Sequence, residues 1–137
     1  MLHTLHSPPI VEVTLWITAA RLATLKAAGE PIPRQVNLEA LVDTGCTFTM
    51  VDPHVIALLG VEPTGEWREI HFIAEHPFRA PVYEIAWGLR AMWSQYRWLE
   101  FNVVAAPVMG VGMYIGRDAL SGMRFIFEPP SFSLEFK

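Results

Sequence analysis

The chain has 137 residues, of which 52% are hydrophobic and 18% are charged, so it is more apolar than an average soluble domain. This length fits a single domain spanning residues 1–137 and leaves little room for a second. The formal net charge is −4 and the basic residues are scattered, which argues against a nucleic-acid partner. No apolar run approaches the roughly 18 residues that a membrane-spanning helix requires.

A strand pattern opens the chain. Val11, Val13, Leu15 and Ile17 alternate with the residues at 12, 14, 16 and 18, which is typical of a half-buried strand. Residues 19–30 favour a helix by propensity, but they are few, show no cap and end at a Glu-Pro pair, so this segment stays open between helix and loop. Residues 35–43 read as an apolar strand that leads directly into Thr44 and Gly45.

A short helix and more strands are predicted after this point. Asp52 is expected to cap a helix that begins at Pro53, continues to Leu59 and is followed by Gly60. Three strand-like segments come next: 67–75, 80–89 and 97–106. The last third contains an apolar run, a helical turn and two strands: 113–116, 117–122, 124–127 and 131–136. This pattern predicts an all-β sandwich or barrel with one or two short helices.

One cysteine and the first residues bear on location and assembly. Cys46 has no partner for an internal disulfide and is compatible with a reducing compartment. The first ten residues lack the basic start and apolar core of a secretory signal, so we expect a cytoplasmic protein. A chain this short buries only about two-thirds of its unfolded surface, so some apolar residues are expected to cover an interface between two copies.

The most informative stretch is Leu41-Val42-Asp43-Thr44-Gly45. An acid follows a buried strand, so the strand holds the carboxylate rigidly, and a hydroxyl and a glycine come next. Gly45 allows a tight turn and a close approach by another backbone. Thr44 can form a hydrogen bond locally or across an interface. Taken alone, Asp-x-Gly is also common turn chemistry.

A second motif gives this stretch more weight. Residues 114–120 read Tyr-Ile-Gly-Arg-Asp-Ala-Leu, which is two apolar residues, a glycine, an arginine and the start of a helix. Together with Ala40–Gly45 and the Thr-Phe-Thr-Met sequence at 47–50, this motif resembles the retropepsin-like aspartic proteases, the single-domain relatives of pepsin that work as homodimers. The resemblance covers roughly residues 10–136, and only the two motifs are specific.

The resemblance implies a site and an activity. Asp43 would be the single catalytic carboxylate that each chain contributes to an endopeptidase, and it would share a proton with Asp43 of the partner subunit. Thr44 and Gly45 would support the active-site turn, with Thr44 bonded across the dimer axis. Three residues would pack under the site: Ile115, Gly116 and Arg117. The implied partners are a second copy of the chain and an extended peptide, with no metal or cofactor.

Two features depart from the family pattern. A flap hairpin should lie between residues 66 and 85, but its tip at 74–80 has no glycine, which puts its closing motion in doubt. The family commonly has an acid four residues after the catalytic Asp, paired with the Arg of the second motif. That position is Thr47 here, so Arg117 must find another partner or face solvent.

Other chemistry-bearing residues have simpler interpretations. Cys46 is expected to be a packed thiol, because no basic neighbour in the sequence would activate it. His71 and His76 are interpreted as surface or flap residues rather than metal ligands. Three tryptophans are expected to anchor the core or an interface rather than form an aromatic binding face: Trp87, Trp93 and Trp98. Six apolar residues are expected to wall the peptide cleft: Met50, Val51, Ile73, Phe78, Val108 and Met113.

Two alternatives were weighed against the protease. A phosphoryl-accepting Asp, as in haloacid-dehalogenase-like enzymes, would resemble Asp-x-Asp, but the second acid is Gly45 here and the βα repeats are absent. The other alternative is a retropepsin-like fold that serves as a non-catalytic dimerisation or peptide-binding module. The intact Asp-Thr-Gly argues against this second alternative, and the unusual flap argues for it.

Overall fold

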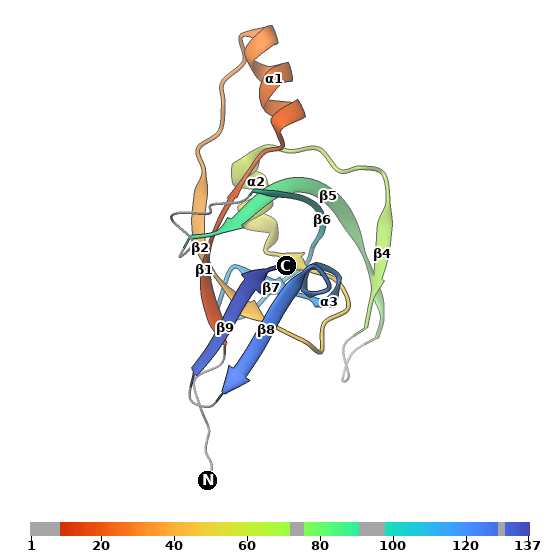
Figure 1. The fold of residues 1–137 in the computed structure, drawn as a ribbon. Coiled ribbons are helices and arrows are strands. Elements are labelled where there is room, and N and C mark those ends of the chain that lie inside the picture. The colour runs from red at the N-terminus through yellow and green to blue at the C-terminus, as the bar shows by residue number, and fades with distance from the viewer. Residues whose placement is uncertain (1–8, 72–75, 91–97, 129–130) are drawn as a thin grey trace.

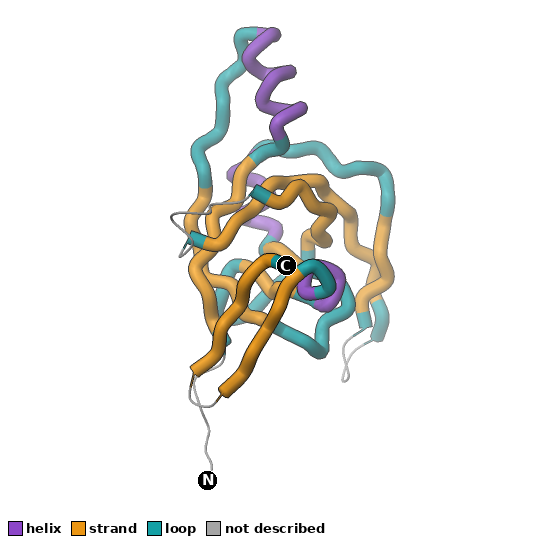
Figure 2. The backbone as a smooth tube through the Cα atoms, viewed as in Figure 1, coloured by secondary structure: helices purple, strands orange, loops and turns teal. Residues whose placement is uncertain are grey.

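A closed six-stranded β-barrel dominates the computed structural model (Figures 1 and 2), which describes residues 9–71, 76–90, 98–128 and 131–137. The elements in chain order are β1 Ile10–Trp16, α1 Ala19–Ala28, β2 Val36–Val42, β3 Met50–Val51, α2 Pro53–Leu59, β4 Trp67–Ile70, β5 Phe78–Leu89, β6 Leu99–Ala105, β7 Met113–Ile115, α3 Arg117–Leu120, β8 Met123–Glu128 and β9 Ser131–Phe136. The predicted all-β barrel or sandwich is confirmed in its coarser form: the fold is mostly β, with a closed barrel and a few short helices.

The barrel closes because its first strand pairs on both sides. The strand order is β1-β2-β7-β3-β6-β5, and β1 also pairs with β5 through the register Val13↔Leu89 to Trp16↔Ala86. Most neighbours are antiparallel, whereas β2–β7 and β3–β6 run parallel. Closure leaves these six strands with no long free edge, which removes a surface prone to aggregation.

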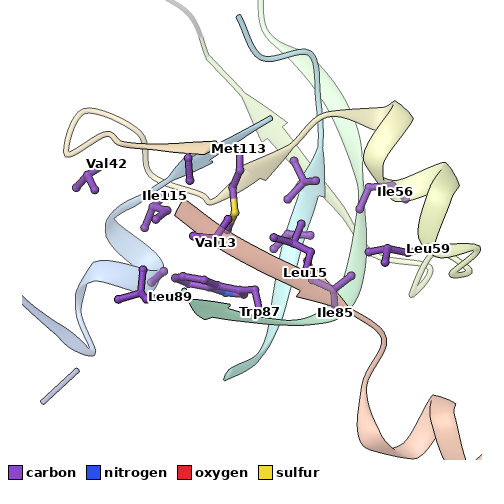
Figure 3. Packing of buried hydrophobic residues seen from close by; sticks show 14 of the residues in the cluster. Val13, Leu15, Val42, Ile56, Leu59, Ile85, Trp87, Leu89, Met113 and Ile115 are labelled. Atoms are coloured by element: carbon purple, nitrogen blue, oxygen red, sulfur yellow. The ribbon is translucent and has the colours of Figure 1, made fainter. Parts of the chain in front are cut away.

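The barrel interior holds the main hydrophobic core (Figure 3). Alternate residues of β1 and β5 point inward, so Leu15, Ile85 and Trp87 are fully buried there. Burial of such a side chain stabilises a fold by about 1.5–3 kcal/mol. Trp98 instead packs against Trp16, with ring centroids 6.2 Å apart. Trp87 and Trp98 therefore pack as expected, and Trp93 lies outside the described residues.

The two longer helices test the cap predictions. Helix α2 has the predicted bounds, and the Asp52 carboxylate accepts a hydrogen bond from the His54 N–H at 2.9 Å. The segment at 19–30 was left open and is a helix, and the prediction that it lacks a cap was wrong. Its cap is Thr18, whose hydroxyl accepts from the Arg21 N–H at 3.2 Å. The Glu100 carboxylate also accepts from the first N–H of α1.

The predicted flap hairpin corresponds to β4 and β5. These strands pair antiparallel from Trp67↔Pro81 to Ile70↔Phe78, so the arms of the hairpin form where expected. Residues 72–75, which include the start of the glycine-free tip, lie outside the described residues. Strand β3 was not predicted, because two residues carry no periodic pattern. It exists through pairing with both β6 and β7.

Strands β8 and β9 form a separate two-stranded sheet (Figure 1). Its apolar side chains alternate with polar ones except at Ile126, so one face is apolar and the other mostly polar. On that face Phe125 and Leu134 pack against the barrel core, while Phe127 nearer the turn remains 47% exposed. Among the helices of the described residues, none has the length and apolar character that a membrane crossing requires.

Candidate active site

Asp43 lies immediately after β2, at the point where the chain leaves the barrel. Its N–H still donates to the Ile115 carbonyl of β7 at 2.9 Å, so the start of the turn is held by the sheet. The Cys46 N–H then donates to the Asp43 carbonyl, and the Gly45 N–H donates to the Asp43 carboxylate at 3.0 Å. These bonds restrain both the backbone and the side chain of Asp43.

The Asp43 carboxylate is half-buried and faces an open pocket of about 540 Å³. The residues lining this pocket are Asp43, Gly45, Cys46, Thr47, Phe48, Met50, Glu69, Ile70, His71 and Tyr114. The pocket therefore lies between the Asp-Thr-Gly turn, β4 and β7. Most of its lining is apolar, with Glu69 and His71 as polar residues on the flap side.

The predicted pocket walls are only partly correct. Met50 lines the pocket, and Phe78 and Val108 pack against the same small cluster behind it. Val51 and Met113 are fully buried in the barrel core instead, because inward alternation along β3 and β7 turns them away from the pocket. Ile73 lies outside the described residues.

Thr44 occupies the turn beside Asp43 without lining the pocket. The residue is exposed, and its hydroxyl forms no hydrogen bond to any part of the chain that the structure describes. This hydroxyl is therefore available to another molecule.

The two sequence motifs contact each other directly. The Arg117 N–H donates to the Cys46 carbonyl at 2.8 Å, and the Asp118 N–H donates to the Thr47 carbonyl at 3.2 Å. The Arg117 guanidinium also donates to the Thr47 hydroxyl at 2.9 Å. Arg117 therefore has a hydrogen-bond partner at Thr47, while its side chain stays on the surface.

Gly116 is required by this contact. A Cβ atom at this position would lie 2.6 Å from the carbonyl carbon of Phe48, 2.7 Å from its oxygen and 2.9 Å from the Cys46 oxygen. Real Cβ contacts are essentially never this short, and all three atoms belong to the backbone. The chain after Asp43 can approach the second motif this closely only because residue 116 has no side chain.

Sequence reasoning missed two residues that join the motifs, Thr49 and Asp118. Thr49 is fully buried, and its N–H and hydroxyl both donate to the Asp118 carboxylate, the hydroxyl at 2.7 Å. The Thr49 hydroxyl in turn accepts from the Gly116 N–H at 3.1 Å. The acid in the Gly-Arg-Asp motif was a visible signal, but nothing near Thr49 in the sequence indicated its partner.

Cys46 is a packed thiol, as predicted. Burial, together with the negative charge of Asp43, raises the pKa of this thiol to about 11. Its sulfur donates to the Phe48 carbonyl at 3.1 Å. Because the thiolate is the nucleophilic form, Cys46 is a poor nucleophile at neutral pH although it lines the pocket.

The histidines near the flap do not gather into a ligand set. The His71 Nε2 lies 3.5 Å from a Glu69 carboxylate oxygen, and His76 is exposed. Within the described ranges, no three His, Cys, Asp or Glu side chains are grouped closely enough to hold a metal ion. Asp43 is the only residue of the Asp-Thr-Gly turn with an ionisable side chain in the pocket.

Comparisons with known proteins add no relationship. No family model matches the chain, and no curated protein matches it.

Proposed function

We propose that this chain is one subunit of a homodimeric aspartic endopeptidase of the retropepsin-like kind, with a catalytic pair made of Asp43 and Asp43 of the partner subunit. One observation carries the proposal: a restrained carboxylate faces an open, largely apolar pocket on a turn that the second motif supports. An extended peptide is the expected substrate, because apolar side chains fit the lining and β4 lies beside the pocket as a strand.

The chemistry requires a second carboxylate. Peptide hydrolysis without a metal needs a base that activates water and an acid that protonates the substrate carbonyl. Two carboxylates in contact share one proton and provide both roles as a pair. A two-fold axis beside Asp43 would supply the missing group from a second copy.

Two surfaces support a second copy as the partner. The free hydroxyl of Thr44 lies next to Asp43, where it can bond across a two-fold axis. The β8–β9 sheet carries two exposed apolar residues, Phe127 on the apolar face and Ile126 on the opposite face. A two-stranded sheet is marginal alone and gains from pairing with another strand. The half-buried thiol fits a cytoplasmic enzyme.

Asp43→Asn tests the proposal. The amide keeps the shape of the carboxylate but cannot act as a base, so cleavage of extended apolar peptides should vanish while the fold and the dimer persist. The assay is mass spectrometry of a peptide pool at pH 4–8, with light scattering on both proteins. Retained cleavage in Asp43→Asn would refute the catalytic role. If the wild-type dimer cuts nothing, the chain is a dimerising or peptide-binding module instead.

A further inference from the structure

The loop between β6 and β7 contacts the residues behind the wall of the Asp43 pocket and has little support of its own. Its C-terminal end is fixed, because the Gly112 N–H donates to the Glu39 carbonyl at 3.0 Å. Residues 107–111 form no backbone–backbone hydrogen bond with any residue the structure describes. Gly110 adopts a φ of +78°, and a glycine also leaves this part of the backbone less restricted than any other residue would. A loop of this kind samples many positions unless a side chain restrains it.

Tyr114 supplies that restraint. Its hydroxyl accepts a hydrogen bond from the Met109 N–H at 2.9 Å and donates to the Met109 carbonyl at 3.4 Å. One phenol thus engages both polar backbone groups of Met109. The Tyr114 backbone is itself held within the barrel, where it pairs with Leu41 on one side and Met50 on the other.

The same tyrosine belongs to the wall of the Asp43 pocket. It lines the pocket together with Met50 and Ile70, and Val108 of the loop packs against that same apolar cluster. The loop is therefore attached to the pocket wall at two adjacent residues, through Val108 packing and through the Met109 backbone. The Met109 side chain is left 84% exposed.

We propose that Tyr114 is a specificity-determining positioning residue, whose hydroxyl holds residues 107–112 so that Met109 forms an apolar wall against one side chain of a bound peptide. This inference rests on the proposed function. An exposed methionine on a restrained backbone offers a defined apolar contact, because its thioether side chain adapts while its Cα stays in place. Without the hydroxyl, the wall would move and discrimination by size would weaken.

Hydrogen exchange tests the restraint without any need for activity. In the free protein, Tyr114→Phe should accelerate exchange of the Met109 amide by about tenfold or more, because that amide loses its acceptor. Tyr83→Phe is the matched control, since the Tyr83 hydroxyl has no hydrogen bond within the described residues. Unchanged exchange in Tyr114→Phe would overturn the inference.

Cleavage selectivity tests the functional part. The peptide that the wild type cuts best is identified from a pool, and analogues are made in which one of its large side chains is replaced by Ala. The selectivity ratio is kcat/KM for the best peptide divided by kcat/KM for its Ala analogue. Met109→Ala should reduce the preference for the large side chain at one position by about tenfold, and Tyr114→Phe should reduce it at the same position. Leu58→Ala, an exposed apolar residue on α2, is the control for Met109→Ala.

The outcomes separate this inference from the proposed function. A purely structural effect would lower kcat/KM equally for the best peptide and its Ala analogue and would leave the selectivity ratio unchanged. Cleavage that persists with an unchanged ratio in both variants overturns the inference and leaves the proposed function standing. Absence of cleavage by the wild type overturns both.

Discussion

Replacing Gly116 by alanine tests how tightly the two motifs are packed. The added Cβ would lie within 2.6–2.9 Å of three backbone atoms of Cys46 and Phe48, so the turn that follows Asp43 must move. The backbone φ at Gly116 is −89°, which alanine adopts without strain, so the cost comes from the contact alone. Overpacking costs about 1–3 kcal/mol, and weakening the two backbone bonds from Arg117 and Asp118 adds about 1 kcal/mol.

We therefore expect a loss of about 3 kcal/mol, which corresponds to a fall in Tm of about 10 °C for a domain of this size. Thermal and urea unfolding should be measured at equal protein concentration, because dimerisation makes Tm depend on concentration. Gly122→Ala is the matched control, since its Cβ would meet only the Ala119 oxygen at 3.7 Å. If Gly116→Ala is within 0.5 kcal/mol of Gly122→Ala (a difference typical of neutral surface changes), the packing argument is wrong.

Three further predictions concern the contact between the two motifs, the dimer interface and Cys46. Asp118→Ala leaves the buried N–H and hydroxyl of Thr49 without an acceptor and should lower the free energy of unfolding in urea by about 2–4 kcal/mol. A loss below about 1 kcal/mol would show that the hydrogen bonds between Thr49 and Asp118 are dispensable. Deletion of residues 131–137 should shift light scattering toward monomer, and an unchanged dimer would exclude β9 from the interface. At pH 8, alkylation of Cys46 should be about a hundredfold slower in the native protein than in the urea-unfolded protein, since only the thiolate reacts. The rate in the native protein should increase with pH up to about 11, the raised pKa of the thiol. Equal rates in native and unfolded protein would contradict the raised pKa.

Local signals in the sequence were enough for much of the fold. Asp52, Pro53 and Gly60 marked both ends of α2, and they do so because capping depends on residues adjacent in the chain. The cap of α1 was missed because Thr18 also continues the alternation of β1, so one residue belongs to two patterns. Strand β3 was missed because its two residues depend on distant strands for their conformation.

In the candidate site, too, features set by adjacent residues could be predicted and contacts between distant residues could not. Asp43, Thr44 and Gly45 could be singled out from the sequence because their order is itself informative. The bond between Thr49 and Asp118 joins residues 69 positions apart, so no local pattern predicts it. The two-fold pairing of Asp43 involves a second chain and stays a prediction.

The central claim is that each active site needs one Asp43 from each of two chains. The most direct measurement is cleavage by mixtures of wild-type and Asp43→Asn chains that are unfolded together, refolded and assayed at constant total concentration. Random pairing gives both wild-type carboxylates in about one quarter of the dimers at equal mixing, so activity should fall with the square of the wild-type fraction. Activity that falls in direct proportion to that fraction would mean that one Asp43 is sufficient, which contradicts the shared pair.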